Sequence, residues 1–389
     1  MTPPLAQLDD TLKVVVSLRQ IGTYTDRFRV FLELSEHVEC LYLLTDYVDD
    51  ESRALAQAYP HLQLIEIEAR RYAKESTAWL VEHVVNGTGV FVVHSTFGYL
   101  VQFFEMYGSV SERTFRLIHS QYTANHDWFN HVRLQDYPMS FNYLGQRVKS
   151  YWRDRRMAWN IDGLLVMCEG HKPRVAEAHG LPLSKVFVMP SEVNADFYGI
   201  TAPQRTTPMR IVFVGACYKN KGLDLILQAL PPVLKRFPNL EVELYGNAVK
   251  RQTAWLMEAL REPDLCGRVI MKNRVKKTRL RQAFHEADLL VSASRFEGSP
   301  RAVREAIAAG CPALLSEIAG HVGLDPHQRF IQYVSTPSID SWSAAMIQCL
   351  ERTDEEWLRA AERGMEAMQM DHHPASVARS LLTIYESLF

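Results

Sequence analysis

The sequence lacks the features that mark membrane-spanning, secreted or disulfide-rich proteins. It has no apolar run of about 18 residues that could span a bilayer, and its N-terminus lacks the basic stretch and apolar core of a secretion signal. Its six cysteines are scattered, with no close pair spaced for zinc. We therefore expect a cytoplasmic protein with reduced core cysteines.

A strong excess of charge of one sign is also missing. The formal net charge is −2 over 389 residues, which argues against a general nucleic-acid binder. The hydrophobic share of 47% and the charged share of 23% are typical of a globular protein. The length exceeds one ordinary core and predicts two domains.

Short apolar segments alternate with longer helical patterns, which is typical of parallel α/β sheets. In the first half, the expected strands span residues 13–18, 39–44, 63–67, 89–94, 114–119, 163–168 and 185–189. In the second half, they span residues 210–215, 241–245, 269–271, 288–292, 312–316 and 329–333. The polar, proline-bearing stretch 199–208 between the halves is the predicted linker.

Two glutamates eight positions apart, Glu297 and Glu305, enclose the segment Gly298-Ser299-Pro300-Arg301. Ser299 as N-cap and Pro300 as first helical residue predict a helix that Gly310 ends. Because eight residues span about 12 Å along a helix, the two carboxylates could hold opposite ends of a long ligand. Backbone N–H groups between them suit a diphosphate. The spacing alone leaves open a surface ion pair between Arg301 and Glu305.

The segment 291–312 (VSASRFEGSPRAVREAIAAGCP) resembles the glutamate, seven residues, glutamate motif of retaining GT-B glycosyltransferases of family 4. Residues 210–224 resemble that family's donor-phosphate loop, and Leu244-Tyr245-Gly246 its second glycine turn. The similarity is continuous from Arg210 to Gly320 and patchier before. There, residues 188–194 resemble the interdomain segment, and residues 117–120 the histidine loop of the N-terminal domain.

The resemblance implies an α/β GT-B fold, in which two Rossmann-like domains with parallel sheets face each other across a cleft. The implied domains are an acceptor domain at residues 1–198 and a nucleotide-sugar donor domain at residues 199–370. A C-terminal helix at residues 371–389 would return to the first domain. Ligands of such sheets bind at the carboxyl ends of the strands.

The resemblance also assigns roles around the two glutamates. Glu305 would accept hydrogen bonds from the ribose, and Glu297 from the hydroxyls of the donor sugar. Lys221 is the expected cation for the diphosphate; since the chain has no Asp-X-Asp motif, we expect neither a metal nor another cofactor. The expected donor-binding residues are Gly215, Lys219, Lys221, Arg274, Val275, Glu297, Gly298, Ser299, Pro300, Arg301 and Glu305.

One departure from the family is Ala216, which stands where an arginine usually follows the first glycine. Lys219, Arg295 or Arg301 could supply the missing positive charge. On the acceptor and sugar side, the resemblance points to Gly22, His94 and His119, and it makes His119 catalytic together with Glu297 and Lys221. The alternatives are hydrogen-bonded structural histidines and, at Gly22, a plain turn.

The implied activity is transfer of a hexosyl-type sugar, with retention of configuration, from a nucleotide-diphosphate sugar to a saccharide, lipid-linked or glycoconjugate acceptor in polysaccharide biosynthesis. A catalytically silent carbohydrate-binding or partner-stabilising subunit, favoured by Ala216, and a nucleotide-sugar epimerase remain alternatives. Aromatic and basic residues are interleaved at 128–159. They indicate either peripheral contact with an anionic bilayer at the inner membrane face or a helix with a buried aromatic face and solvated arginines.

Overall fold

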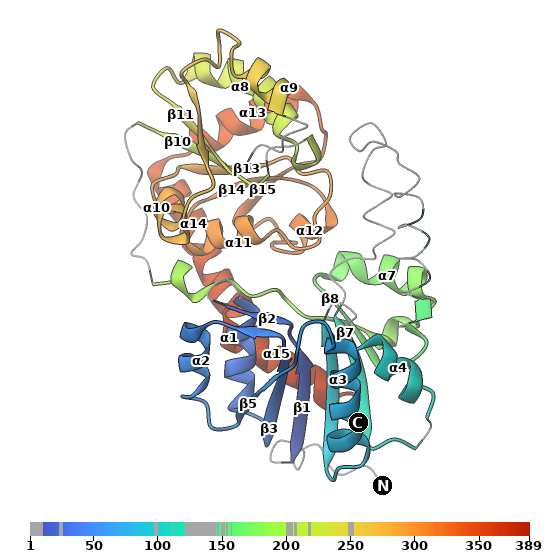
Figure 1. Cartoon of the computed structure of the whole chain (residues 1–389). Helices are drawn as coiled ribbons and strands as arrows, with labels where there is room; N and C mark the ends of the chain where they lie inside the picture. The colour runs from blue at the N-terminus through green and yellow to red at the C-terminus, as the bar shows by residue number, and fades with distance from the viewer. Residues whose placement is uncertain are drawn as a thin grey trace. The chain divides into compact units, whose positions relative to one another are not determined.

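The computed structural model contains two compact units, each built on a parallel sheet (Figure 1). The structure describes residues 11–22, 26–96, 100–110, 112–120, 145, 148, 152, 155–156, 158–199, 205, 208–216, 219–247 and 253–389. Unit 1 comprises Met1–Phe129, Met139–Glu192 and Pro374–Phe389, and unit 2 comprises Asn130–Pro138 and Val193–His373. The chain thus leaves unit 1 after Glu192 and returns to it at Pro374.

In the described part of unit 1, seven parallel strands form the main sheet in the order β5-β3-β1-β6-β7-β8-β9. They are β1 (Leu12–Ser17), β3 (Cys40–Thr45), β5 (Leu62–Glu66), β6 (Val90–Thr96), β7 (Phe115–Ser120), β8 (Gly163–Val166) and β9 (Val186–Val188). Two shorter strands, β2 (Gln20–Ile21) and β4 (Tyr47–Val48), pair separately. The sequence did not predict them, because two residues are too few to show an alternation.

Helices cover both faces of this sheet, as expected for a strand order that requires crossovers. Val14 and Val16 of β1 pack on the face that holds α1 (Asp26–Ser35) and α15 (Pro374–Glu386). Val15 belongs to the core on the opposite face, with α3 (Tyr72–Leu80), α4 (Val101–Tyr107) and α7 (Lys172–His179). A single π-helical turn (Val81–Val85) extends α3, and α2 (Asp50–Ala56) precedes β5. Figure 1 shows α1 and α15 lying side by side behind the strands of this unit.

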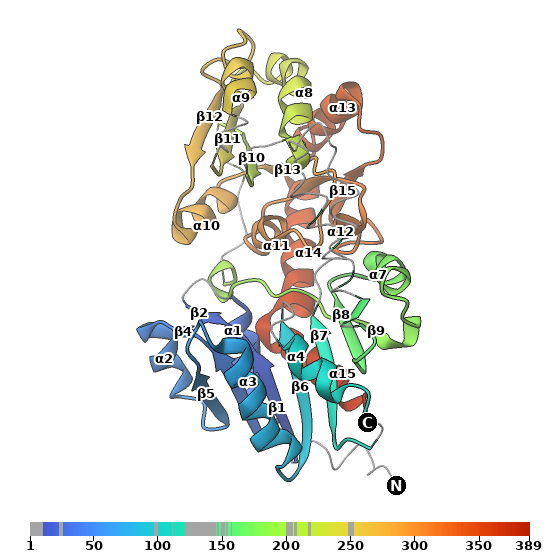
Figure 2. The same ribbon diagram turned by 45° about the vertical axis from the view of Figure 1, so that its right-hand side comes forward.

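In unit 2, six described strands form a parallel sheet in the order β12-β11-β10-β13-β14-β15. They are β10 (Arg210–Val214), β11 (Glu241–Tyr245), β12 (Val269–Asn273), β13 (Leu289–Ser292), β14 (Ala313–Ser316) and β15 (Ile331–Val334). Ile211 and Phe213 face α8 (Leu223–Arg236), α9 (Thr253–Ala259) and α13 (Ile339–Leu350), whereas Val212 faces α10 (Lys277–His285), α11 (Arg301–Ala308) and α14 (Asp354–His372). Figure 2 shows α8 beside α13 and α11 beside α14.

The two parallel sheets confirm the predicted α/β fold class, and each predicted strand matches an observed one to within about two residues. The predicted start of α11 was wrong by one position. The helix begins at Arg301, and Pro300 is its N-cap. The Ser299 hydroxyl does not cap it and instead accepts a hydrogen bond from Arg304.

The end of α11 at Gly310 is confirmed. The Cys311 N–H donates to the Ala306 carbonyl (2.9 Å) and the Gly310 N–H to the Ile307 carbonyl (3.0 Å), which is the Schellman arrangement.

Two other sequence expectations concern the described residues as a whole. No described helix has the length and apolar character needed to cross a bilayer. Cys40, Cys168, Cys311 and Cys349 are buried free thiols, as expected for core cysteines, whereas Cys266 is exposed.

Candidate functional site

The candidate site of unit 2 is formed by loops that follow β10, β13 and β14. Because the sheet is parallel, the carboxyl ends of these strands lie at one edge, where α/β proteins bind ligands. The loop after β10 leads through Gly215 to Lys221, the loop after β13 runs from Ala293 to Pro300, and Ser316 ends β14. The Ser316 hydroxyl donates to the Ser294 carbonyl (2.6 Å), which ties the last two loops together.

The two predicted residues Lys221 and Glu297 meet at this edge. The Lys221 Nζ atom lies 2.6 Å from the Glu297 Oε1 atom, and the Ser294 hydroxyl donates to the same oxygen at 2.8 Å. The side chains are 25% and 14% exposed, so both can be reached by a ligand from solvent. The site therefore presents a cation and a carboxylate next to each other.

Three contacts lock the loop of Lys221 to the loop of Glu297. The Arg295 backbone N–H donates to the Asn220 carbonyl (2.9 Å), and the Arg295 guanidinium binds both carboxylate oxygens of Asp224 (2.9 and 2.8 Å). Gly222 has a φ of +70°, and a Cβ atom there would lie 1.9 Å from the Ala293 carbonyl oxygen. Only glycine allows this close approach without a shift of the backbone.

Arg295 was one of three candidates to replace the charge missing at Ala216. Its bidentate pair with Asp224 shows that it positions the two loops. Arg301, another candidate, is exposed in the first turn of α11. The side chain of Lys219, the third, lies outside the described residues.

Helix α11 carries the second glutamate in a buried setting. Glu305 is 5% exposed, and the preceding Arg304 is 3% exposed with its guanidinium donating to the Ser299 hydroxyl. Gly298, Ser299 and Pro300 connect Glu297 to the first turn of α11, where backbone N–H groups and the helix dipole favour an anion.

The turn after β14 supports Glu297 from another side. A Cβ atom at Gly320 would lie 2.2 Å from the Glu297 carbonyl oxygen, so the first turn of α12 (Ala319–Val322) packs directly on the backbone of Glu297. The next residue, His321, is fully buried, and its Nδ1 donates to the Ser316 carbonyl at 2.9 Å. Burial lowers the pKa of His321 to about 4, although the nearby Glu297 carboxylate opposes this shift. The ring is therefore neutral at pH 7.

The remaining predicted donor residues lie at the neighbouring strand ends. The Gly246 N–H donates to the Asn273 carbonyl (3.0 Å), and a Cβ atom at Gly246 would lie 1.9 Å from the Gly215 carbonyl oxygen. The two predicted glycine turns are thus in contact. Arg274, directly after β12, is exposed. Val275 is partly buried and packs against the core of unit 2 on the α10 and α11 side of the sheet.

In unit 1, His94 is enclosed in the core at β6. Its Nδ1 lies 2.7 Å from the Tyr385 hydroxyl of α15 and its Nε2 lies 2.6 Å from the Ser120 hydroxyl of β7. The ring is 0% exposed, and burial holds the pKa of His94 well below its usual value. This geometry favours the structural alternative for His94.

His119 and Gly22 lie in unit 1 near the carboxyl ends of its strands. His119 is the penultimate residue of β7 and is 7% exposed, and its Nδ1 lies 2.9 Å from the Ser95 carbonyl oxygen. Gly22 follows β2, and a Cβ atom there would lie 3.0 Å from a carboxylate oxygen of Asp49. Residues 121–144 after β7 lie outside the described part of the chain, as does most of the predicted bilayer segment 128–159.

Sequence reasoning missed four residues that shape the unit 2 site, namely Ser294, Arg304, Ser316 and His321. Ser294 and Ser316 stand at or just after strand ends, which is a readable signal in a parallel sheet. Arg304 lies one turn from Pro300 and Ala308, on the buried side of α11, so helical spacing alone could have placed it there. No sequence pattern marks His321.

Comparison with known proteins identifies unit 2. Residues 208–352 match the model of the family Glycosyl transferases group 1. This part of unit 2 is therefore similar to the group 1 glycosyltransferases. The matched region contains Lys221, Glu297, Glu305 and His321, so the geometry above lies within it.

Two curated relatives illustrate the similarity. The chain is 25% identical over 160 residues to a glycogen synthase of Mycobacterium tuberculosis, covering 41% of this chain and 38% of the relative. It is 31% identical over 144 residues to a GDP-mannose:cellobiosyl-diphosphopolyprenol alpha-mannosyltransferase of Xanthomonas oryzae, covering 36% of this chain and 37% of the relative. The chain therefore spans less than half the length of these relatives.

Solved structures show the same fold over nearly the whole chain. Anabaena Alr3699/HepE in complex with UDP and glucose has a TM-score of 0.67 at 11% identity, covering 96% of this chain and 99% of that chain. WaaG, a glycosyltransferase involved in lipopolysaccharide biosynthesis, has a TM-score of 0.66 at 13% identity, with coverage of 96% and 99%. The predicted GT-B fold is confirmed, and the region similar to the group 1 glycosyltransferases lies in its second Rossmann-like half.

Proposed function

We propose that this protein is a retaining glycosyltransferase of family 4 that moves a hexosyl-type sugar from a nucleotide-diphosphate sugar to a saccharide, lipid-linked or glycoconjugate acceptor, without a metal. The observation that carries the proposal is the Lys221–Glu297 pair at the carboxyl edge of the unit 2 sheet, 2.6 Å apart and partly exposed. A departing diphosphate needs a fixed cation, and a sugar hydroxyl needs a fixed acceptor. The pair offers one of each.

Charge stabilisation is the main chemical task in this reaction. Lys221 and the backbone N–H groups at the start of α11 would bind the diphosphate as negative charge develops on it. Their positions are fixed by the Arg295–Asp224 and Gly222–Ala293 contacts, so little reorganisation is needed when the donor binds. These groups supply positive charge without a metal, which is why we propose metal independence.

The two glutamates divide the recognition of the donor between them. Glu305, nearly buried in α11, would accept hydrogen bonds from the vicinal ribose hydroxyls. Glu297 would hold hydroxyls of the sugar near the reacting carbon, and the Ser294 hydroxyl and Lys221 keep its carboxylate oriented. From unit 1, we assign His119 to the sugar on the family resemblance.

We favour substitution on one face of the sugar through an oxocarbenium-like state. In this step a donor phosphate oxygen takes the proton of the attacking acceptor hydroxyl as the bond from the sugar to the phosphate breaks. Glu297 is already paired with Lys221 and Ser294, so we assign it to positioning the sugar rather than to a covalent intermediate.

The proposal is tested by incubating the purified protein separately with UDP-glucose, GDP-mannose and ADP-glucose, with and without a mixture of saccharide acceptors. The name of the Xanthomonas relative contains GDP-mannose, and the Anabaena structure contains UDP and glucose. We chose the donors to be tested for this reason. We expect one donor to release its nucleoside diphosphate at a rate that EDTA does not change. We expect NMR of the product to show a retained anomeric configuration. Release that requires a divalent metal would contradict metal independence, and an inverted product would contradict retention.

A catalytically silent subunit remains the second candidate, because Ala216 follows Gly215 where the family usually has arginine. The same experiment separates the two functions. Saturable binding of a nucleotide-sugar without hydrolysis or transfer to any acceptor would favour the silent subunit.

We also propose peripheral contact with an anionic membrane through the segment 128–159, of which the structure describes residues 145, 148, 152, 155, 156, 158 and 159. Val148, Trp152 and Trp159 are 52%, 54% and 66% exposed. Val148 and Trp152 are helical and four positions apart, and Trp159 lies in a turn. Arg155 and Arg156 are also helical. We expect the protein to float with liposomes of anionic lipid at low salt and Trp152→Ser to reduce this; absence of flotation would remove the proposal.

A further inference from the structure

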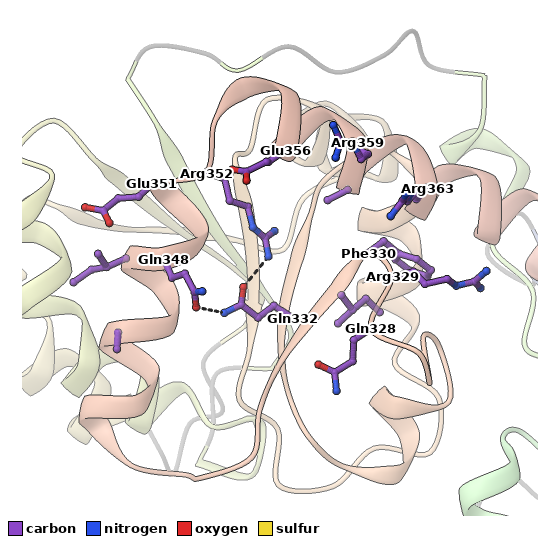
Figure 3. Close-up of a pocket in the computed structure, with 14 residues that line it drawn as sticks. Gln328, Arg329, Phe330, Gln332, Gln348, Glu351, Arg352, Glu356, Arg359 and Arg363 are labelled. Carbon is purple, nitrogen blue, oxygen red and sulfur yellow. Dashed lines mark hydrogen bonds between the residues drawn. The ribbon is translucent and has the colours of Figure 1, made fainter.

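A cavity of about 750 Å³ lies in unit 2 between β15, α13 and α14 (Figure 3). It is lined from the strand side by Gln328 to Gln332, which lead into the amino end of β15. The candidate donor residues follow the carboxyl ends of β10, β13 and β14. Because the sheet is parallel, the cavity and the donor residues belong to opposite edges of the same sheet. The cavity is therefore a separate site within unit 2.

The lining of the cavity carries an excess of positive charge. Four arginines, at 329, 352, 359 and 363, stand against two glutamates, at 351 and 356. Both carboxylates have other partners. Glu351 pairs with Arg236 at 2.7 Å, and Glu356 accepts the Thr353 backbone N–H at 3.0 Å in the capping box of α14.

One arginine is fixed in place by a chain of side-chain hydrogen bonds. The Arg352 guanidinium donates to the Gln332 amide oxygen at 2.7 Å, and the Gln332 amide nitrogen donates to the Gln348 amide oxygen at 2.9 Å. Figure 3 shows Gln332 of β15 between its two partners, Gln348 of α13 and Arg352 in the turn before α14. A guanidinium has five N–H donors, so Arg352 keeps donors for a ligand while its orientation is set.

The arginines of α14 stand one turn apart on one helix face. Arg359 pairs with the exposed Glu355 at 2.6 Å, and Arg363 has no ion pair within the part of the chain that the structure describes. Like charges at this spacing destabilise a helix. Arg329 lines the cavity from the strand side and pairs with Asp325 at 3.9 Å. An anion bound beside Arg359 and Arg363 would relieve the repulsion between these two side chains.

We propose that this cavity is a binding site for a sugar phosphate. Arginine forks match the geometry of a phosphate, and the amides of Gln328, Gln332 and Gln348 can donate to and accept from sugar hydroxyls. The partly exposed Ile347 offers apolar contact to the carbon face of a sugar ring. The volume lies in the range typical of small-molecule sites. The inference does not depend on the transferase activity proposed above.

The test is isothermal titration of the full-length protein with glucose 1-phosphate, glucose 6-phosphate, glucose and inorganic phosphate. We expect one of the two sugar phosphates to bind saturably, at least tenfold more tightly than glucose or phosphate alone. A saturating nucleoside diphosphate should leave this binding in place, because the donor residues lie at the other edge of the sheet. Equal affinity for inorganic phosphate alone, or no saturable binding of either sugar phosphate, would overturn the inference.

Variants at exposed positions locate the binding. Arg359 and Arg363 are exposed on α14, so the double variant R359Q/R363Q should fold, which thermal unfolding checks. We expect it to bind the sugar phosphate at least tenfold more weakly. The matched control is Arg261→Gln, an exposed arginine of unit 2 outside the cavity, which should bind like wild type. Undiminished binding by the double variant would show that the sugar phosphate binds elsewhere.

Discussion

The ammonium of Lys221 lies 2.6 Å from the carboxylate of Glu297, although the two residues are 76 positions apart. They come from loops after different strands. In the proposed function, Lys221 binds the diphosphate of the donor and Glu297 binds the sugar. In the free protein they neutralise each other. A bound diphosphate would therefore have to share Lys221 with the carboxylate.

Replacing Lys221 with methionine should weaken nucleoside diphosphate binding about tenfold or more, because a hydrogen bond to a charged group contributes about 1.5–3 kcal/mol. Stability should change by less than about 1 kcal/mol, since the pair is partly exposed. Titration calorimetry and urea unfolding measure the two effects. The control is Lys235→Met, at an exposed lysine near the end of α8. Equal affinity in Lys221→Met and wild type would remove Lys221 from the diphosphate site.

Gly320→Ala should lower turnover at least tenfold while changing nucleotide affinity much less. A Cβ atom at this position would lie 2.2 Å from the Glu297 carbonyl oxygen, so the loop that carries Glu297 must shift. Small displacements of a positioning group are costly to catalysis. Steady-state kinetics, with the nucleotide-sugar that the donor panel identifies, measures turnover. Gly145→Ala, where a Cβ atom has no neighbour within 4 Å, is the control. Wild-type turnover in Gly320→Ala would contradict the positioning role of this contact.

The stability of the protein should fall with pH below about 6.5, in part because of His321. Its pKa is about 4 in the folded state and near 6.5 when unfolded, so the unfolded state binds more protons between these values. This residue alone should cost roughly 2 kcal/mol between pH 7 and pH 5. Buried His94 acts in the same direction, so the comparison with His321→Asn isolates the effect. Parallel stability curves for wild type and variant over this range would show that His321 is not buried as described.

Tyr385→Phe should destabilise the protein by about 1–2 kcal/mol, because it leaves the buried Nδ1 of His94 without its hydrogen-bond partner. Nucleoside diphosphate affinity should stay unchanged, since both residues lie in the core of unit 1. Chemical unfolding and calorimetry test the two statements. A large loss of nucleotide affinity without a loss of stability would instead favour a sugar-side role for His94.

Much of the fold could be predicted from the sequence because each buried strand is a short apolar run between helical patterns. The expected strand at 241–245 coincides with β11, and those at 210–215 and 288–292 match β10 and β13 to within a residue. The paired strands β2 and β4 were missed because each has only two residues, too few to show an alternating pattern. The start of α11 was wrong by one position because propensity does not show that Arg304 engages the Ser299 hydroxyl.

The candidate site was predictable only in part. The motif brought Glu297 and Lys221 to one sheet edge, and the structure places their charged groups in contact. The supporting contacts could not be predicted, because Asp224, Ala293 and Gly320 act through distances between segments far apart in the sequence. The arginine-lined cavity was also missed, since Arg329, Arg352 and Arg363 come from separate elements and match no motif.

The most direct test of a nucleotide-sugar site in unit 2 is titration of UDP, GDP and ADP into wild type and Glu305→Gln. Glutamine keeps the size of this buried residue but replaces the carboxylate that would bind the ribose diol. We expect one nucleoside diphosphate to bind wild type, to bind Glu305→Gln roughly tenfold or more weakly, and to bind the exposed control Glu258→Gln like wild type. Equal affinity in wild type and Glu305→Gln, or no binding of any of the three, would contradict the account.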